Sequence, residues 1–168
     1  MSRKSVPKLQ ESMRELVVRM GRVVARSGGR VVTAESCTGG LIASAITEQE
    51  GSSQWFDRGY ICYSDQSKQE MLAVNGLLIK EHGAVSEEVV RLMAQNARMY
   101  SGADFSVAVS GIAGPTGGSD YKPVGTVWLA WADANGCNTS CVCFDGDRNL
   151  IRHQTAFMAL QGLLARMQ

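Results

Sequence analysis

Apolar residues follow two different spacings along the chain, which predicts helices separated by short strands. Over Lys8–Arg26 they recur every three or four positions, as on the buried face of an amphipathic helix, and a serine and two glycines end this stretch. The β-branched run Arg30–Ala34 then predicts a buried strand. The apolar residues of Leu41–Ile46 predict a short helix after that strand.

The rest of the chain continues this alternation. The predicted elements are, in order, a strand at Gly59–Tyr63, a helix capped at Ser64, a longer helix opened by Ser86, strands at Asp104–Ser110, Val124–Ala132 and Asn138–Phe144, and a helix capped by Asp147. A short apolar segment without an assigned element connects the first two of these helices. Asn135 and Gly136 suit a tight turn, so the last two strands are predicted to form an antiparallel hairpin.

This order of elements predicts an α/β fold, a three-layer α/β/α sandwich whose mixed, mostly parallel sheet is covered by helices on both faces. The 168 residues are enough for one domain with its own core, which we expect to span residues 8–168. Residues 1–7 are expected to form a flexible N-terminal tail. Ligands of such sheets bind beyond the carboxyl ends of strands, so the segments that follow the strands are candidates for a site.

Charge and composition argue against several classes of function. The chain has 17 basic and 16 acidic residues, and this balance does not suggest a nucleic-acid partner. No stretch approaches the roughly 20 apolar residues of a membrane-spanning helix, so no membrane partner is expected. The odd number of cysteines and the lack of a secretory leader favour a cytoplasmic protein. Cys137, Cys141 and Cys143 lack the paired spacing of a zinc site, and no metal is expected.

Two glycine-rich segments follow predicted strands. Thr33–Gly40 forms the turn from a strand into a helix, where free backbone N–H groups and the helix dipole suit an anion or a developing oxyanion. Ser36, Cys37 or Thr38 could present a nucleophile there, although an ordinary helix cap explains the same residues. Gly111–Gly118 lacks the lysine of a P-loop and is interpreted as a backbone cradle for a phosphate or an oxyanion.

A serine nucleophile needs a base, and the chain offers few. His82 and His153 are the only histidines, and neither lies in the glycine-rich segments, so a serine-histidine-aspartate triad has no support from the sequence. Lys68 lies one helical turn after Ser64 and could act as the base if burial lowers its pKa. A solvated lysine on a helix surface is the alternative. Cys37 has two readings as well, a reactive thiol or a small core residue.

Six motifs together resemble a known family. In order along the chain they are TAESCTGG, GSSQWFDRGY, YSDQSK, HGAVSEE, SGIAGPTGG and KPVGTVW, and they extend from about Arg30 to Arg152. This set resembles the C-terminal domain of the CinA family. The resemblance implies an amidohydrolase that converts nicotinamide mononucleotide (NMN) and water to nicotinic acid mononucleotide and ammonia, in pyridine nucleotide recycling. It also implies that no cofactor is needed and that the chain forms a homodimer.

The resemblance also implies roles for individual residues. Ser36 resembles the family's nucleophile, Lys68 its base, and Tyr63 a residue that assists proton transfer. Asp65 stands where the family usually has asparagine, which adds a charge near these groups. The residues expected to bind the substrate are Cys37, Thr38, Gly39, Ser53, Ser110, Gly111, Gly114 and Arg148. Arg148 is expected near the substrate phosphate, with Arg152 one helical turn further on as the alternative.

Two further hypotheses remain open at this stage. The same fold could bind a nucleotide without hydrolysing it and act as a sensor, and the charge of Asp65 leaves room for that reading. Aromatic residues support self-association separately, because some of them should lie near exposed turns where an interface would cover them. These residues are Trp55, Phe56, Trp128 and Trp131.

Overall fold

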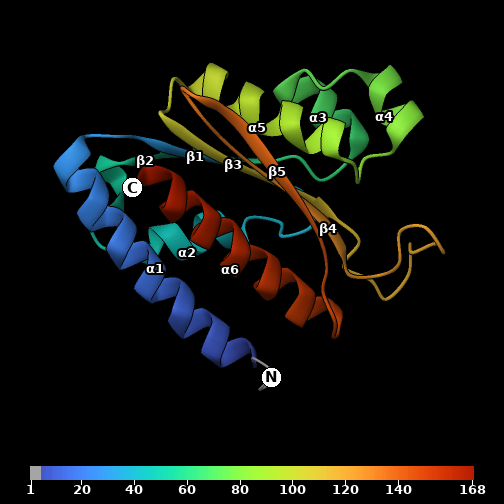
Figure 1. Ribbon diagram of the computed structural model, residues 1–168, viewed down its shortest axis with the longest axis horizontal. Helices are drawn as coiled ribbons and strands as arrows, with labels where there is room; N and C mark the ends of the chain where they lie inside the picture. The colour runs from blue at the N-terminus through green and yellow to red at the C-terminus, as the bar shows by residue number, and fades with distance from the viewer. Residues whose placement is uncertain (1–4) are drawn as a thin grey trace.

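A five-stranded sheet with helices on both faces forms the molecule, and the computed structural model describes residues 5–168 (Figure 1). The elements are α1 (Val6–Ser27), β1 (Val31–Glu35), α2 (Leu41–Thr47), the 3-10 turn η1 (Ser52–Gln54), β2 (Phe56–Ile61), α3 (Asp65–Leu72), α4 (Gly76–His82), α5 (Glu87–Ser101), β3 (Phe105–Gly111), β4 (Thr126–Asp133), β5 (Gly136–Cys143) and α6 (Arg148–Met167). Helices α1, α2 and α6 cover one face, and α3, α4 and α5 cover the other. The predicted three-layer α/β/α sandwich is confirmed.

The strands lie in the order β2-β1-β3-β4-β5. β1 is parallel to both of its neighbours, β2 and β3, whereas β4 is antiparallel to β3 and to β5. Four strands therefore point in one direction and β4 alone opposes them, which confirms the mixed, mostly parallel sheet and the hairpin between β4 and β5. Glu35 at the end of β1 is paired with Val109 of β3. The segments that follow β1 and β3 therefore lie at the same edge of the sheet.

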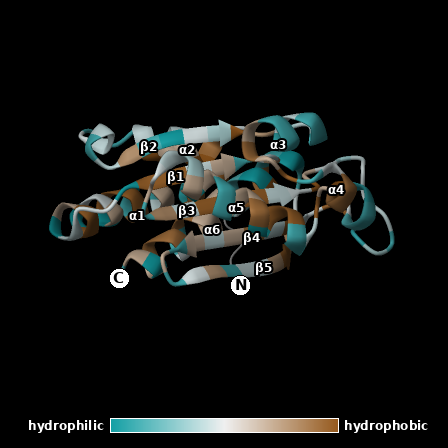
Figure 2. Ribbon diagram, turned by 90° about the horizontal axis from the view of Figure 1, so that it is seen from above, coloured by the Kyte–Doolittle hydropathy of each residue, from teal (hydrophilic) through white to brown (hydrophobic). Residues whose placement is uncertain are grey.

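Each face of the sheet contributes to one hydrophobic core. Residues from α1, α2 and α6 fill the first core, and residues from α3, α4 and α5 fill the second. The central strands β1, β3 and β4 are buried almost throughout and mostly hydrophobic, whereas β2 and β5 at the edges are partly exposed (Figure 2). This is the pattern expected of a sheet whose middle is covered on both sides.

The aromatic residues occupy different places from those expected. Trp55 and Trp131 are buried in the first core, with 6% and 8% of their surfaces exposed. Phe56 and Trp128 are half-buried and pack against the two cores. The argument that these side chains need an interface to cover them is therefore wrong for both buried tryptophans, because the chain's own core covers them.

Local boundaries differ from the predictions at several places. Helix α4 was not predicted, and the Asn75 side chain caps it by accepting a hydrogen bond from Leu77 N at 2.8 Å. Strand β2 begins at Phe56, three residues before its predicted start. Helix α1 begins at Val6, inside the predicted tail of residues 1–7. The first four residues of that tail lie outside the described residues.

Membrane-spanning and metal-binding features were searched within residues 5–168. None of the helices in this range is both long enough and apolar enough to cross a bilayer. In the same range, no three side chains of histidine, cysteine, aspartate or glutamate come together as metal ligands. All five cysteines are free thiols.

Candidate active site

A pocket of about 240 Å³ lies beyond the carboxyl ends of β1 and β3. Side chains from the turn after β1, the start of α3, the segment before α5, the loop after β3 and the start of α6 form its walls. The lining residues are Ser36, Cys37, Tyr63, Asp65, Lys68, Ala84, Val85, Ser110, Gly111, Ala113 and Arg148. The fold thus brings together the two glycine-rich segments and the start of the helix that carries Lys68.

The turn after β1 holds Ser36 at the edge of the pocket. Ser36 is buried with 7% of its surface exposed, and its backbone N–H donates to the Val109 carbonyl oxygen of β3 at 3.1 Å. Its own carbonyl oxygen accepts a hydrogen bond from Gly39 N at 3.1 Å. These two bonds fix the Ser36 backbone at the carboxyl ends of β1 and β3.

The carboxylate of Glu35 caps the start of α2 by accepting hydrogen bonds from its backbone N–H groups. It accepts hydrogen bonds from the backbone N–H groups of Gly40 at 3.0 Å, Ile42 at 3.0 Å and Ala43 at 2.8 Å. The Thr38 hydroxyl donates to the same carboxylate at 2.7 Å. The N–H groups of Gly40, Ile42 and Ala43 are therefore not available to a bound anion, because a fully buried side chain of the protein already accepts from them.

Two backbone donors remain beside Ser36. Within residues 5–168, the N–H groups of Cys37 and Thr38 donate to no other residue, although the Cys37 N–H interacts with its own side-chain sulfur, whereas Ser36 N and Gly39 N are both engaged. An oxyanion formed at Ser36 could therefore be bound by these two groups. Sequence reasoning did not identify the capping role of Glu35, although a carboxylate shortly before a helix start is the signal for it.

Lys68 is enclosed by the pocket and the second core, with only 1% of its surface exposed. Its amine donates to the carbonyl oxygens of Tyr63 at 3.2 Å and Ser64 at 3.4 Å. Burial lowers the pKa of this amine, while the Asp65 carboxylate, 3.8 Å from Nζ, acts in the opposite direction. The alternative of a solvated surface lysine is therefore wrong.

Arg148 connects the two sides of the pocket. Its guanidinium group donates to the Gly114 carbonyl oxygen at 2.8 Å and to the Tyr63 hydroxyl at 3.1 Å. Arg152 instead donates to the carbonyl oxygens of Cys37 at 3.1 Å and Thr38 at 2.6 Å, and it does not line the pocket. Of the two arginines, only Arg148 presents its charge to the pocket.

Hydrogen bonds also hold the pocket wall formed by the segment before α5. The Ser110 hydroxyl donates to the Ala84 carbonyl oxygen at 2.8 Å. The Lys122 amine donates to the carbonyl oxygens of His82 at 2.9 Å and Val85 at 2.8 Å. Sequence reasoning did not select Ala84, Val85 or Lys122, because their role depends on contacts between segments that are distant in the chain.

Glycine is required at several positions of the second glycine-rich segment, of which two lie beside the pocket. A Cβ atom on Gly111 would lie 2.6 Å from Val127 Cγ2, and one on Gly114 would lie 2.5 Å from Val124 Cγ1. Gly114 also has a φ of +76°, which side chains disfavour. The loop can approach β4 this closely only without these side chains.

Some expected site residues lie outside the pocket. Ser53 is exposed in η1, which precedes β2 and so lies at the opposite edge of the sheet from Ser36. Thr38, Gly39 and Gly114 adjoin lining residues without lining the pocket themselves. The structure therefore brings Ser36, Tyr63, Lys68, Ser110 and Arg148 together, but not Ser53.

Neither histidine lines the pocket, and Cys37 is a poor nucleophile. His153 is buried and its Nδ1 is hydrogen bonded to the Asn149 carbonyl oxygen at 2.8 Å, within α6. His82 Nδ1 lies 3.4 Å from a Glu88 carboxylate oxygen. Burial raises the pKa of the Cys37 thiol to about 12, so the reactive thiolate form is suppressed.

Similar proteins share both the sequence and the fold. The family model described as the CinA C-terminal domain matches residues 13–167. Nicotinamide-nucleotide amidohydrolase PncC of Pseudomonas putida is 53% identical over 149 residues, covering 89% of this chain and 93% of that protein. PncC of Escherichia coli K12 is 49% identical over 150 residues, covering 89% of this chain and 91% of that protein.

Among solved structures, the competence/damage-inducible protein CihA of Agrobacterium tumefaciens superposes with a TM-score of 0.89 at 44% identity. The match covers 94% of this chain and 96% of that one. The family match spans most of the chain, and the two PncC relatives cover nearly all of their own length. The chain therefore belongs to the CinA C-terminal domain family.

Proposed function

We propose that this protein is an amidohydrolase that converts NMN and water to nicotinic acid mononucleotide and ammonia. The names of its relatives from P. putida and E. coli support this substrate. The observation that carries the mechanism is the buried amine of Lys68, which shares one pocket with Ser36 and has a lowered pKa. A serine beside such an amine can be activated without a histidine.

In the proposed mechanism, Ser36 Oγ attacks the carboxamide carbon and Lys68 Nζ accepts the hydroxyl proton. The C–N bond then breaks, and Lys68 returns the proton to the departing ammonia. Water hydrolyses the resulting acyl-enzyme, with Lys68 again acting as the base. Tyr63 assists these transfers from the pocket mouth. The backbone N–H groups of Cys37 and Thr38 bind the oxyanion, and such a donor contributes about 3 kcal/mol in characterised enzymes.

Arg148 is proposed to hold the substrate phosphate. Its guanidinium group lines the pocket and is held in place by the Gly114 carbonyl oxygen and the Tyr63 hydroxyl. A phosphate can take further charge-assisted hydrogen bonds from such a group. Arg152 is committed to the backbone of the Ser36 turn, where it contributes to the shape of the site rather than to phosphate binding.

The direct test is to incubate purified protein with NMN and to measure ammonia release. The wild-type protein should release ammonia, and Ser36→Ala should not. Ser44→Ala on α2 is the matched control, because Ser44 lies outside the pocket and should leave the rate unchanged. If folded wild-type protein releases no ammonia from NMN, the proposed activity is wrong.

Asp65 favours a second candidate, a nucleotide-binding module with weak or no turnover. Its carboxylate lies 3.8 Å from Lys68 Nζ and stabilises the protonated amine, which cannot act as a base. Calorimetry separates the two functions. NMN binding without ammonia release, unchanged by Ser36→Ala, would identify the binding module.

We also propose a homodimer, now on the basis of exposed hydrophobic side chains rather than of the tryptophans. Several large hydrophobic side chains are exposed on the single chain, including Leu77 at 74%, Met99 at 64% and Tyr121 at 96% of their surfaces. An interface between two copies could cover such residues. The buried tryptophans no longer contribute to this argument.

A further inference from the structure

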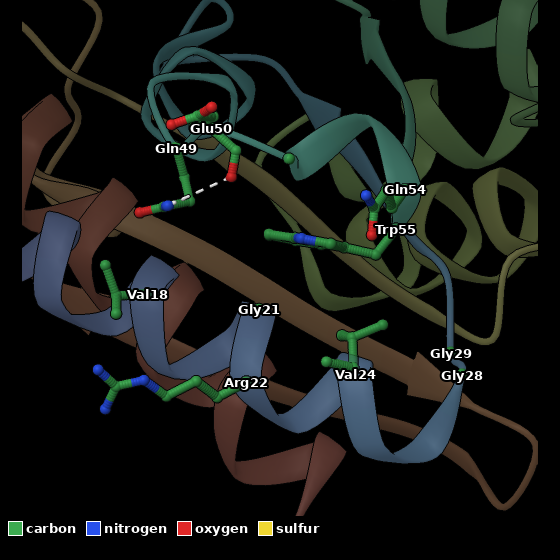
Figure 3. Close-up of a pocket in the computed structure, with 12 residues that line it drawn as sticks. Val18, Gly21, Arg22, Val24, Gly28, Gly29, Gln49, Glu50, Gln54 and Trp55 are labelled. Atoms are coloured by element: carbon green, nitrogen blue, oxygen red, sulfur yellow. Dashed lines mark hydrogen bonds between the residues drawn. The ribbon is translucent and has the colours of Figure 1, made fainter.

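A second and larger cavity lies at the end of the sheet opposite to Ser36, where β1 begins. It measures about 520 Å³ and is formed between α1 and the segment Gln49–Trp55 (Figure 3). The Trp55 carbonyl oxygen accepts a hydrogen bond from Val31 N, at the start of β1, which fixes this place at the amino end of that strand. Pockets of this size accommodate small organic molecules.

The inner wall of the cavity is apolar, and one of its positions is a glycine, which adds no side chain to the wall. Gly21 and Val24 of α1 lie opposite Trp55, and Val18, further along the helix, lies opposite Gln49 (Figure 3). Glycine is a poor residue for the interior of a helix, and nothing in the packing requires it at position 21. A Cβ atom there would lie 3.6 Å from Trp55 Nε1, which is an ordinary contact distance. The missing side chain therefore leaves space beside the indole nitrogen.

Trp55 presents an unused hydrogen-bond donor to this space. The side chain is buried with 6% of its surface exposed, yet its indole N–H has no hydrogen-bond partner within residues 5–168. Trp131, which is similarly buried, donates its N–H to the Ala159 carbonyl oxygen at 2.9 Å. In the described chain, every fully enclosed polar side-chain atom has a partner, so Trp55 Nε1 must be accessible from the cavity. A ligand atom that accepts a hydrogen bond would satisfy it.

Side chains of opposite charge stand at the rim. Arg22 of α1 and Glu50 of the opposite segment both line the cavity, and neither forms an ion pair in the described chain. Together the two side chains carry no net charge, so the lining has no net preference for an anion or a cation. Gln54 adds an amide that can both donate and accept hydrogen bonds.

We propose that this cavity is a second binding site, for an uncharged heterocyclic molecule of nucleoside size. Its carbonyl oxygen or ring nitrogen accepts the Trp55 N–H, its ring lies against Gly21 and the two valines, and its polar edge meets Gln54. The site is separate from the Ser36 pocket and shares no lining residue with it.

The test uses the full chain labelled with ¹⁵N, in which the three tryptophans give separate indole N–H resonances. Trp55→Phe identifies the resonance of Trp55. Adenosine, uridine and inosine, three uncharged nucleosides, are then added separately at millimolar concentration. At least one of them should shift the Trp55 resonance saturably, while the Trp131 resonance stays in place.

Gly21→Leu fills the space beside the indole and should abolish the shift. Arg19→Leu on the exposed side of the same helix is the matched control and should retain it. Circular dichroism should first establish that both variants are folded. The proposal is overturned if none of the three probes moves the Trp55 resonance, or if the shift persists in Gly21→Leu. It is also overturned if the resonance moves with protein concentration alone, since a second copy of the chain would then occupy the cavity.

Discussion

At the scale of single residues, Lys68 determines whether the pocket can catalyse the proposed hydrolysis of NMN. Replacing Lys68 by Met keeps the side chain's length and apolar stem but removes the amine. We expect ammonia release from NMN to fall by about 10²–10⁴-fold or more, with nucleotide binding largely retained, because a general base is lost. Steady-state rates and calorimetry measure the two effects.

Three controls accompany this prediction. Lys80→Met makes the same change at an exposed lysine of α4 and should leave the rate unchanged. His82→Gln and His153→Gln should alter the rate only modestly, because neither histidine lines the pocket. A folded Lys68→Met protein with near-normal turnover, together with an inactive histidine variant, would show that the serine-lysine mechanism is wrong.

The pH dependence of activity should report the ionisation of Lys68. Burial lowers its pKa, and only the neutral amine can accept the Ser36 proton, so activity should rise as pH rises through this pKa. Asp65→Asn removes a charge that stabilises the ammonium form. The pKa should fall further, and the pH-rate curve should move to lower pH, with roughly two- to tenfold more activity near neutrality.

Asp120→Asn, in the loop before β4, is the control for Asp65→Asn, because it removes a carboxylate that does not line the pocket. Its pH-rate profile should coincide with that of the wild type. A curve for Asp65→Asn that moves to higher pH would contradict the assignment of Lys68 as the base.

At the scale of elements, α2 is held at its start by Glu35. Glu35→Gln keeps the size of the side chain but weakens its bonds to the N–H groups of Gly40, Ile42 and Ala43. We expect the free energy of unfolding to fall by about 1–3 kcal/mol, because a charged acceptor in a buried cap is lost. Urea denaturation measures this change.

Glu48→Gln at the other end of α2 is the matched control. Glu48 is exposed, and its ion pair with Arg14 at 3.4 Å should contribute less than about 1 kcal/mol. Turnover should fall in Glu35→Gln as well, since the same carboxylate holds the turn that carries Ser36. Equal stability of the two variants would contradict the capping role of Glu35.

At the scale of the whole molecule, the exposed hydrophobic side chains predict self-association. Light scattering at micromolar concentration should give twice the mass of one chain. Leu77→Asp and Tyr121→Asp should each be tested, because these two side chains are exposed at 74% and 96%. Burying a carboxylate in an apolar interface is costly, so a variant within the interface should lower the measured mass. A monomeric wild-type protein would show that the homodimer is wrong.

The amino-acid sequence by itself determined the features that depend on neighbours along the chain. The caps at Ser64, Ser86 and Asp147 were all predicted and are confirmed. Each depends on side chains within one helical turn of the helix end. Helix α4 has only seven residues, too few for a clear apolar period. The start of β2 at Phe56 depends on pairing with Val31 of β1, which no local pattern reveals.

Only the tertiary structure decided how the site is assembled. The sequence motifs singled out Ser36 and Lys68, but the burial that lowers the pKa of Lys68 comes from segments far away in the chain. The fold likewise turns Arg148 toward the pocket, commits Arg152 to the backbone and places Ser53 at the opposite edge of the sheet. Burial, charge and hydrogen bonding depend on every element packed around a group, and local spacing carries no record of those partners.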